Sequence, residues 1–284
     1  MPIKDILVHL DASPRSDVRL GLAALIAARN DAHVTGLHVV DLPSPEVFYG
    51  FPSAFMDVQR AEDVIEQMRA VRHAEAHSIE TKFNERMRAE NLAAEWRLVE
   101  GDAGETVALH ARYCDLVVIG QPDPGQRGGR GIGLAIDDLM ACGRPILAVP
   151  FAGHFTTIGR HVLVGWNGSG EAAHALNDAI PLLRHAEKVT VLAINPRPGI
   201  GGDGDTPARD IALHLARHGI AAEAAHTVAK DIGEGDALLS YAADISADLL
   251  VCGMYGHSRL RERAFGWVTR SLLTEMTIPV LMAH

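Results

Sequence analysis

The chain has 284 residues, 22% charged and 48% hydrophobic, which is the composition of a folded protein with room for two domains. Its formal net charge of -10 argues against a generic electrostatic grip on nucleic acid or on an anionic membrane, and no apolar run is long enough to cross a bilayer. The three cysteines lack metal-ligand spacing, so we expect no disulfide framework and a reducing, cytoplasmic setting.

Alternating strands and helices are predicted through the first half of the chain. Residues 3–10 form a continuous apolar run, typical of a strand that is covered on both faces. The following helix is predicted to run to about Arg29, with Ser13 as its N-cap and Pro14 in its first turn. The other predicted elements of this half are strands at His33–Val40, 94–99, 115–120 and 145–149 and helices at 57–90, 104–112 and 133–142.

The second half shows the same alternation. Strands that alternate with helices predict mostly parallel sheets, right-handed crossovers and helices on both faces. Ligands in such folds bind beyond the carboxyl ends of the strands, where the strand order reverses. The predicted strands of this half are 160–166, 188–194, 221–228, 248–253 and 279–283, and its predicted helices are 169–185, 206–218, 233–246 and 266–276.

The two halves also share residues at matching positions, and several anchors in one order indicate an ancestral duplication. We therefore predict two tandem domains, residues 1–152 and 158–284. Each half closes with an apolar run, at 145–149 and 279–283, and pairing of these edge strands would join the domains as a pseudo-dimer. The matched positions are 6–8 with 162–164, Asp11 with Asn167, Ser13 with Ser169, and 115–120 with 248–253.

The most informative segment begins at the end of a predicted strand and finishes at the start of a predicted helix. Glycines let a backbone approach a ligand closely, and a helix N-terminus leaves free N–H groups that suit a phosphate. The candidate ligand residues are Gly253, Gly256, His257, Ser258, Gly266, Trp267, Val268 and Thr269, with Asn167 at the end of the first strand of this half.

The pattern Gly-x2-Gly-x9-Gly after an apolar strand, with a short polar turn after the first strand of the half, resembles the universal stress protein family. The tandem arrangement resembles the two-domain members of that family. The resemblance implies an α/β fold of two tandem five-stranded parallel-sheet domains, like the adenine nucleotide α-hydrolases, each with strand order 3-2-1-4-5.

By the same resemblance, the protein would bind an adenine nucleotide, ATP or AMP with Mg²⁺, in its second half. It would act as a stress-response regulatory module with at most slow ATP hydrolysis, and a homodimer is expected on resemblance alone. The phosphate and ribose role falls on Gly253, Gly256, Gly266, Val268 and Thr269, and the nucleoside role falls on Asn167, with Ile194 lining the adenine side.

Two departures from the family pattern leave a second interpretation open. Nucleotide binders carry Ser or Thr directly after the last motif glycine, where this chain has Trp267. The acidic position after the first strand is Asn167, which can both donate and accept hydrogen bonds. The alternative is a scaffold that binds a protein partner or another small molecule in place of a nucleotide.

The matching segment of the first half is degenerate. Gly120 and Gly133 keep the spacing, but Asp123 replaces the second glycine, and a carboxylate repels a phosphate. Asp11 keeps the acidic position, yet we expect no nucleotide in this half. The aromatic insertion 42–56 either packs over this crevice or marks a partner or dimer surface.

Histidines and cysteines outside this segment are given structural roles. His73/His77 and His214/His218 have a spacing that can seat two metal ligands on a helix, but a solvated helix surface is the favoured interpretation. Cys252 lies within a predicted strand and is expected to be a small core residue.

Overall fold

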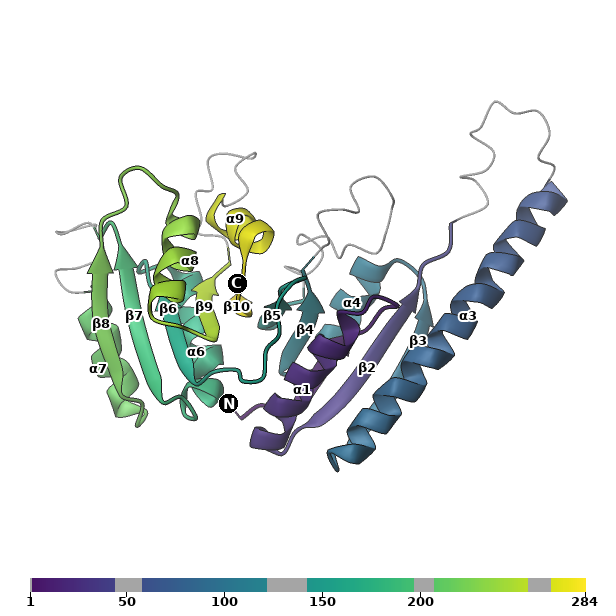
Figure 1. The fold of residues 1–284 in the computed structure, drawn as a ribbon, viewed down its shortest axis with the longest axis horizontal. Helices are drawn as coiled ribbons and strands as arrows, with labels where there is room; N and C mark the ends of the chain where they lie inside the picture. Colours follow the sequence, from purple (N-terminus) through teal and green to yellow (C-terminus); the bar gives the residue numbers. More distant parts are fainter. Residues whose placement is uncertain (1, 44–57, 122–141, 197–206, 255–266) are drawn as a thin grey trace.

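The computed structural model describes residues 2–43, 58–121, 142–196, 207–254 and 267–284 (Figure 1). The strands form one ten-stranded sheet in the order β3-β2-β1-β4-β5-β10-β9-β6-β7-β8. Each half therefore has the strand order 3-2-1-4-5, which confirms the predicted topology. The strands are β1 (Asp5–His9), β2 (His33–Val40), β3 (Ala94–Glu100), β4 (Leu116–Gly120), β5 (Ile146–Val149), β6 (His161–Gly165), β7 (Lys188–Ile194), β8 (Ala222–Thr227), β9 (Leu249–Gly253) and β10 (Val280–Ala283).

The halves meet through their closing strands. β5 and β10 pair antiparallel, with Leu147 opposite Leu281, whereas the other neighbouring strands of the sheet run parallel. Both leucines are buried. The predicted pairing of edge strands is confirmed, and it hides two edges that would otherwise expose unpaired backbone groups.

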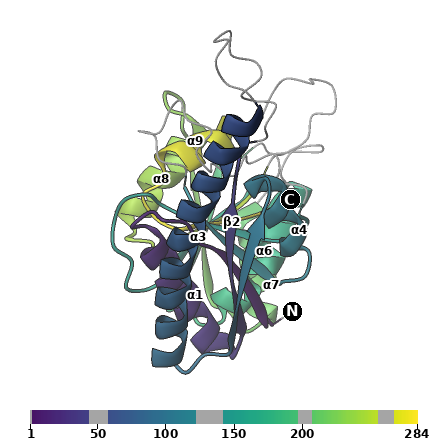
Figure 2. The same cartoon turned by 90° about the vertical axis from the view of Figure 1, so that its right-hand side faces the viewer.

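Helices cover both faces of the sheet because side chains of each strand alternate between them. Ile6 and Val8 of β1 join one buried cluster with α1, α3, α6 and α7, whereas Leu7 joins a second cluster with α4, α8 and α9 (Figures 1 and 2). In the described residues, no helix is long and apolar enough to cross a membrane. The helices are α1 (Ser16–Asn30), α3 (Val58–Ala89), α4 (Ala103–Ala111), α6 (Gly170–Leu183), α7 (Pro207–Arg217), α8 (Glu234–Asp244) and α9 (Trp267–Glu275).

The long helix α3, predicted at 57–90, packs one apolar face on the sheet. Phe83 is fully buried against Gly36 of β2 and Trp96 of β3, and a Cβ at Gly36 would lie 2.8 Å from the Phe83 ring. Only glycine fits this close approach. Ala76 and Met87 are buried on the same face of α3.

An aspartate directly before the fourth strand, at the amino-terminal ends of the strands, is repeated in the two halves. Asp115 Oδ2 accepts hydrogen bonds from the backbone N–H groups of Lys4 and Asp5, at 2.7 and 3.1 Å. Asp248 Oδ1 accepts the corresponding bonds from Arg160 and His161, at 2.9 and 3.0 Å. These repeated contacts tie the start of the first strand to the fourth strand in each half, and they support the duplication.

The predicted start of the first helix is wrong. Ser13 was expected as the N-cap, but α1 begins at Ser16, after an N-cap position at Arg15 that makes no side-chain cap hydrogen bond. Asp11 Oδ1 accepts the Ser13 N–H at 2.9 Å, which holds residues 11–13 in a side-chain-closed turn. The corresponding Ser169 of the second half is a true N-cap, because its Oγ accepts the Ala172 N–H at 3.1 Å.

Candidate functional site

Each half has a point where the strand order reverses, which we call its switch point. In the first half it lies between β1 and β4, and in the second half between β6 and β9. Gly120 ends β4 and Gly253 ends β9, so the first glycine of each motif lies at the carboxyl edge beside the switch point. Open α/β sheets place their ligands at this location.

A tight turn after β6 carries the residue expected to contact a nucleoside. Asn167 Oδ1 accepts the Ser169 N–H at 3.1 Å, and Gly168 between them has a φ of 74°. The side chain of Asn167 is exposed, and its amide nitrogen donates to no group among the described residues. The turn therefore uses the oxygen of Asn167 and leaves an N–H₂ group for another acceptor.

Gly253 serves the packing of β9 against α6. A Cβ at this position would lie 2.5 Å from the Ala172 nitrogen and 2.7 Å from the Glu171 carbonyl carbon. No side chain can be added there without moving the first turn of α6. This motif glycine therefore has a structural reason to be present, whether or not the second-half switch point binds a ligand.

Helix α9 begins directly after the motif and is held on α8. Val268 is half-buried, and Thr269 is 3% exposed on the inner face of the helix. Ser271 Oγ donates to Asp236 Oδ1 at 2.9 Å, and a Cβ at Gly235 would lie 3.2 Å from the Val268 carbonyl oxygen. The first turn of α9 thus rests on the N-terminal turn of α8.

The structure brings part of the predicted site together at one edge of the sheet. Asn167, Ile194 and Gly253 follow or end the neighbouring strands β6, β7 and β9. Ile194 is half-buried and packs in the cluster that contains α8 and α9. Gly256, His257, Ser258 and Gly266 lie outside the described residues, as does most of the aromatic insertion 42–56 and the first-half segment from Pro122.

The switch point of the first half contains a buried cation that sequence reasoning missed. Arg19 of α1 is 3% exposed, and its Nη2 lies 2.9 Å from Asp11 Oδ1. Its Nε donates to the His9 carbonyl oxygen at 2.9 Å, and its Nη2 donates to Ser16 Oγ at 2.7 Å. A Cβ at Gly120 would clash with Arg19 Nη1, so the guanidinium spans the ends of β1 and β4.

The repeat offers the signal that could have revealed Arg19. At the offset that matches Asp11 with Asn167, Arg19 corresponds to Ala175, which is fully buried in the second half. A charged residue at a position whose repeat partner is a core alanine needs a buried counter-charge. Asp11 is the nearby acidic residue that supplies it.

The electrostatics of the first-half switch point follow from this ion pair. Burial alone would raise the pKa of Asp11, but Arg19 and the hydrogen bonds from Ser13 outweigh it and lower the pKa to about 2. Burial, together with the charge of Arg19, lowers the pKa of His9 to about 3, so its ring is neutral near pH 7. His9 Nε2 is buried and has no hydrogen-bond partner among the described residues.

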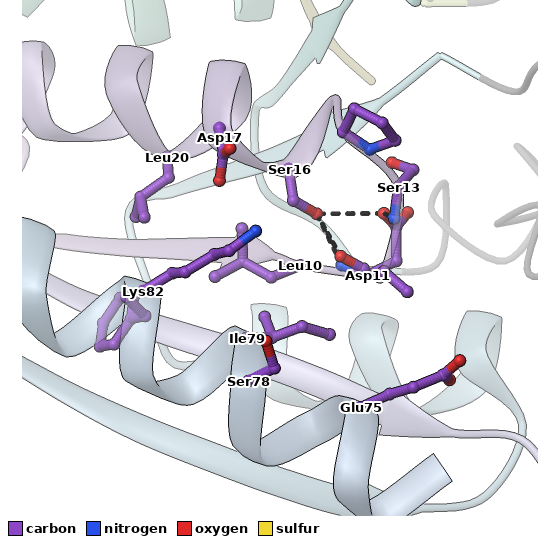
Figure 3. A pocket seen from close by; sticks show the side chains of 13 residues that line it. Leu10, Asp11, Ser13, Ser16, Asp17, Leu20, Glu75, Ser78, Ile79 and Lys82 are labelled. Carbon is purple, nitrogen blue, oxygen red and sulfur yellow. Dashed lines mark hydrogen bonds between the residues drawn. The ribbon is translucent and has the colours of Figure 1, made fainter. Parts of the chain in front are cut away.

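A pocket of about 270 Å³ opens beside the turn at residues 11–13, between α1 and α3 (Figure 3). Leu10, Leu20 and Ile79 supply apolar lining, and Lys82 extends from α3 across the pocket. No residue of β4 lines it. The pocket is therefore separate from the first-half switch point, although it shares Asp11 with it.

The cysteines are buried, and His73 of α3 lies at the surface. Cys252 is buried in β9, as predicted, and burial raises the pKa of Cys114 and of Cys252 to about 12, which disfavours the reactive thiolate. His73 Nε2 lies 2.9 Å from Glu100 Oε1 on the surface. Within the described part of the chain, no three His, Cys, Asp or Glu side chains cluster as metal ligands would.

Comparison with known proteins places these observations in a family. The family model described as Universal stress protein family matches residues 2–133 and again residues 159–284. A universal stress protein from Archaeoglobus fulgidus DSM 4304 superposes with a TM-score of 0.71 at 15% identity, covering 98% of this chain and 97% of that one. A functionally unknown protein from Pseudomonas aeruginosa PAO1 superposes with a TM-score of 0.58 at 16% identity, covering 99% and 92%. Among curated proteins, none matches the sequence.

Proposed function

The chain belongs to the universal stress protein family, and from that premise we propose that it binds an adenine nucleotide, ATP or AMP, in its second half. The proposed domains are residues 1–152 and 158–284, and the nucleotide site belongs to the second of them. The proposed role is that of a cytoplasmic stress-response regulatory module, with homodimerisation as a further part of the proposal.

The difference between the two switch points is the observation that carries this proposal. In the first half, Arg19 crosses the carboxyl ends of β1 and β4 and is neutralised by Asp11. In the second half, the corresponding residue is Ala175, and Asn167 keeps an uncharged N–H₂ donor at the crevice. A ligand would therefore meet the Arg19–Asp11 ion pair in the first half, whereas the position that corresponds to Arg19 is an alanine in the second.

Residue roles in the proposed site follow from chemistry. The N–H groups in the first turn of α9 and the loop before it would hold the phosphates, with Mg²⁺ as the accompanying ion. The proposed role is regulatory, with at most slow hydrolysis of ATP. The phosphate and ribose residues would be Gly253, Gly256, His257, Ser258, Gly266, Trp267, Val268 and Thr269, and the nucleoside residues would be Asn167 and Ile194.

A specific observation favours the alternative, a scaffold for a protein partner or another small molecule. Gly253 is required by its contact with α6, so its presence alone does not demand a nucleotide. Trp267 also removes the hydroxyl that binders carry after the last glycine. Under this alternative, the motif preserves turn geometry around a crevice with another ligand.

The direct test identifies what the purified protein carries and binds. Freshly purified protein is denatured, released small molecules are identified by mass spectrometry, and ATP and AMP are titrated by calorimetry. We expect one nucleotide per chain and a loss of at least about tenfold in affinity for Gly256→Asp, because the carboxylate repels phosphate. The matched control is Asp123→Ala in the first half, which should leave affinity unchanged. Absence of both released nucleotide and titration heat would favour the scaffold.

A further inference from the structure

Gln121 connects the first half to the second through its buried side chain. It follows Gly120 at the end of β4 and is 7% exposed. Its Nε2 donates to the carbonyl oxygens of Leu273 and Thr274, each at 2.9 Å, and its Oε1 accepts the Phe151 N–H at 2.9 Å. One amide therefore joins the first-half motif, the segment after β5 and the last turn of α9.

The contact satisfies groups that a helix leaves open. The last carbonyl groups of an α-helix lack intrahelical donors and carry the negative end of the helix dipole. Gln121 gives two N–H groups to this end of α9, although 152 and 153 residues separate it from the acceptors. The C-terminal cap of α9 is thus supplied by the other half of the protein.

The residue that corresponds to Gln121 in the second half is Met254. Backbone geometry repeats, because Gln121 N–H donates to Val149 O and Met254 N–H donates to Ala283 O, both at 2.8 Å. The side chains differ, since Met254 is apolar and buried in the core. Met254, which has no N–H group in its side chain, therefore cannot return the amide cap that Gln121 supplies.

Helix α9 is consequently fixed at both ends. Its first turn lies against α8 at Val268 and Gly235, and Ser271 near its middle donates to Asp236, within the second half. Its last turn is held by Gln121 of the first half. A helix of nine residues is only about 13 Å long, so a shift at the last turn displaces the first turn as well.

We propose that Gln121 is a positioning residue for the phosphate-binding end of α9. This inference rests on the proposed function, because α9 begins where the phosphates of an adenine nucleotide would bind. The degenerate first half would then act as a support that keeps the N–H groups of α9 aimed at the ligand. Its own motif need not bind anything for this role.

The test compares ATP with adenosine, which lacks phosphates. In Gln121→Glu the side chain keeps its shape and its acceptor for Phe151 but loses both N–H donors to α9. We expect ATP to bind roughly fivefold to tenfold more weakly and adenosine to bind unchanged. Gln121→Leu should show the same split, and amide exchange should speed up within residues 267–275 in both variants.

Asn30→Ala is the matched control. Asn30 Nδ2 donates to the Ile26 carbonyl oxygen at 2.9 Å near the end of α1, so this change also removes an amide cap but touches only the first half. It should leave ATP affinity and α9 exchange unchanged.

Three results would overturn the inference or separate it from the proposed function. Unchanged ATP affinity in folded Gln121→Glu protein overturns it, as does an equal loss for ATP and adenosine. If the wild-type chain binds neither ligand, the proposed function fails and the phosphate role of Gln121 fails with it. Amide exchange then still decides whether Gln121 holds α9, because unchanged exchange in Gln121→Glu would reject that contact as a support.

Discussion

Arg19 Nη2 lies 2.9 Å from Asp11 Oδ1, and this ion pair spans the switch point of the first half. The guanidinium is almost fully buried, while the carboxylate keeps contact with solvent on one side. A charge buried to this extent is stable only with a partner. The pair therefore links the turn after β1, the first helix and the end of β4.

Replacing Arg19 should destabilise the first half. Arg19→Ala leaves Asp11 without its counter-charge and opens a cavity at the switch point, so we expect a loss of about 2–4 kcal/mol in the free energy of unfolding. Chemical denaturation measures it. Adding Asp11→Asn should recover part of the loss, because the uncompensated charge is then gone. A loss below about 0.5 kcal/mol would show that the ion pair is not structural.

The buried His9 should make the protein less stable in mild acid. Its pKa is about 3 in the folded state against an ordinary value of 6.5, so between these values the unfolded chain binds a proton that the native protein does not bind. The contribution of the neutral His9 to the free energy of unfolding is fully present above pH 6.5. It falls by at most about 1.4 kcal/mol per pH unit down to about pH 3. Asp11, with its lowered pKa of about 2, adds a further loss only below pH 3.8.

His9→Leu should flatten this pH dependence. Urea unfolding of the wild type and the variant, at about pH 7 and about pH 5, measures the difference. The matched control is His77→Leu, since His77 is exposed on α3 and should keep the wild-type slope. Equal slopes for wild type and His9→Leu would mean that His9 becomes protonated without unfolding.

Gly253→Ala should destabilise the packing of β9 against α6. The added Cβ meets the backbone of α6 at 2.5 Å, so α6 must move and we expect a loss of about 2 kcal/mol or more. Gly170→Ala is the control, because a Cβ there meets nothing within 4 Å and lies in the first turn of a helix. Thermal unfolding compares the melting temperatures of the two variants. Equal melting temperatures would contradict the close approach of Gly253 to the backbone of α6.

Trp267→Ser tests whether the tryptophan limits nucleotide binding. The substitution restores the hydroxyl that family binders carry after the last motif glycine, and we expect ATP affinity to rise by roughly threefold to tenfold. Leu134→Ser, at the matching position of the first half, should have no effect. Calorimetry decides, and an unchanged affinity in Trp267→Ser would show that the tryptophan is not the limiting feature.

The fold was predictable because runs of neighbouring residues indicate its strands, and because the same pattern occurs in both halves. Apolar runs such as 3–10 and 188–194 mark buried strands, and the repeat fixes their order in both halves. The pairing of β5 with β10 followed from the need to cover two edges. Burial of the α3 face was visible in the spacing of its apolar residues.

The parts that were missed depend on contacts between distant side chains. The predicted helix start is wrong because Ser13 N–H donates to the Asp11 side chain and Ser16 Oγ bonds to the Asp11 backbone. The pair Ser13-Pro14 alone does not indicate these hydrogen bonds. Gln121 follows Gly120 in the degenerate glycine segment of the first half. No neighbouring residue in the sequence indicates that its side chain contacts the carbonyl groups of α9. Such roles depend on three-dimensional neighbours, which spacing alone does not specify.

Because β5 pairs with β10 inside one chain, the switch points of the two halves can change independently in evolution. In a symmetric dimer of identical subunits, every substitution appears twice, so losing one site means losing both. Covalent fusion of two copies removes that constraint, and here the halves pair through β5 and β10. One copy can then accumulate Arg19, Asp123 and Gln121 and specialise as a partner to the other, which stays free to keep a ligand.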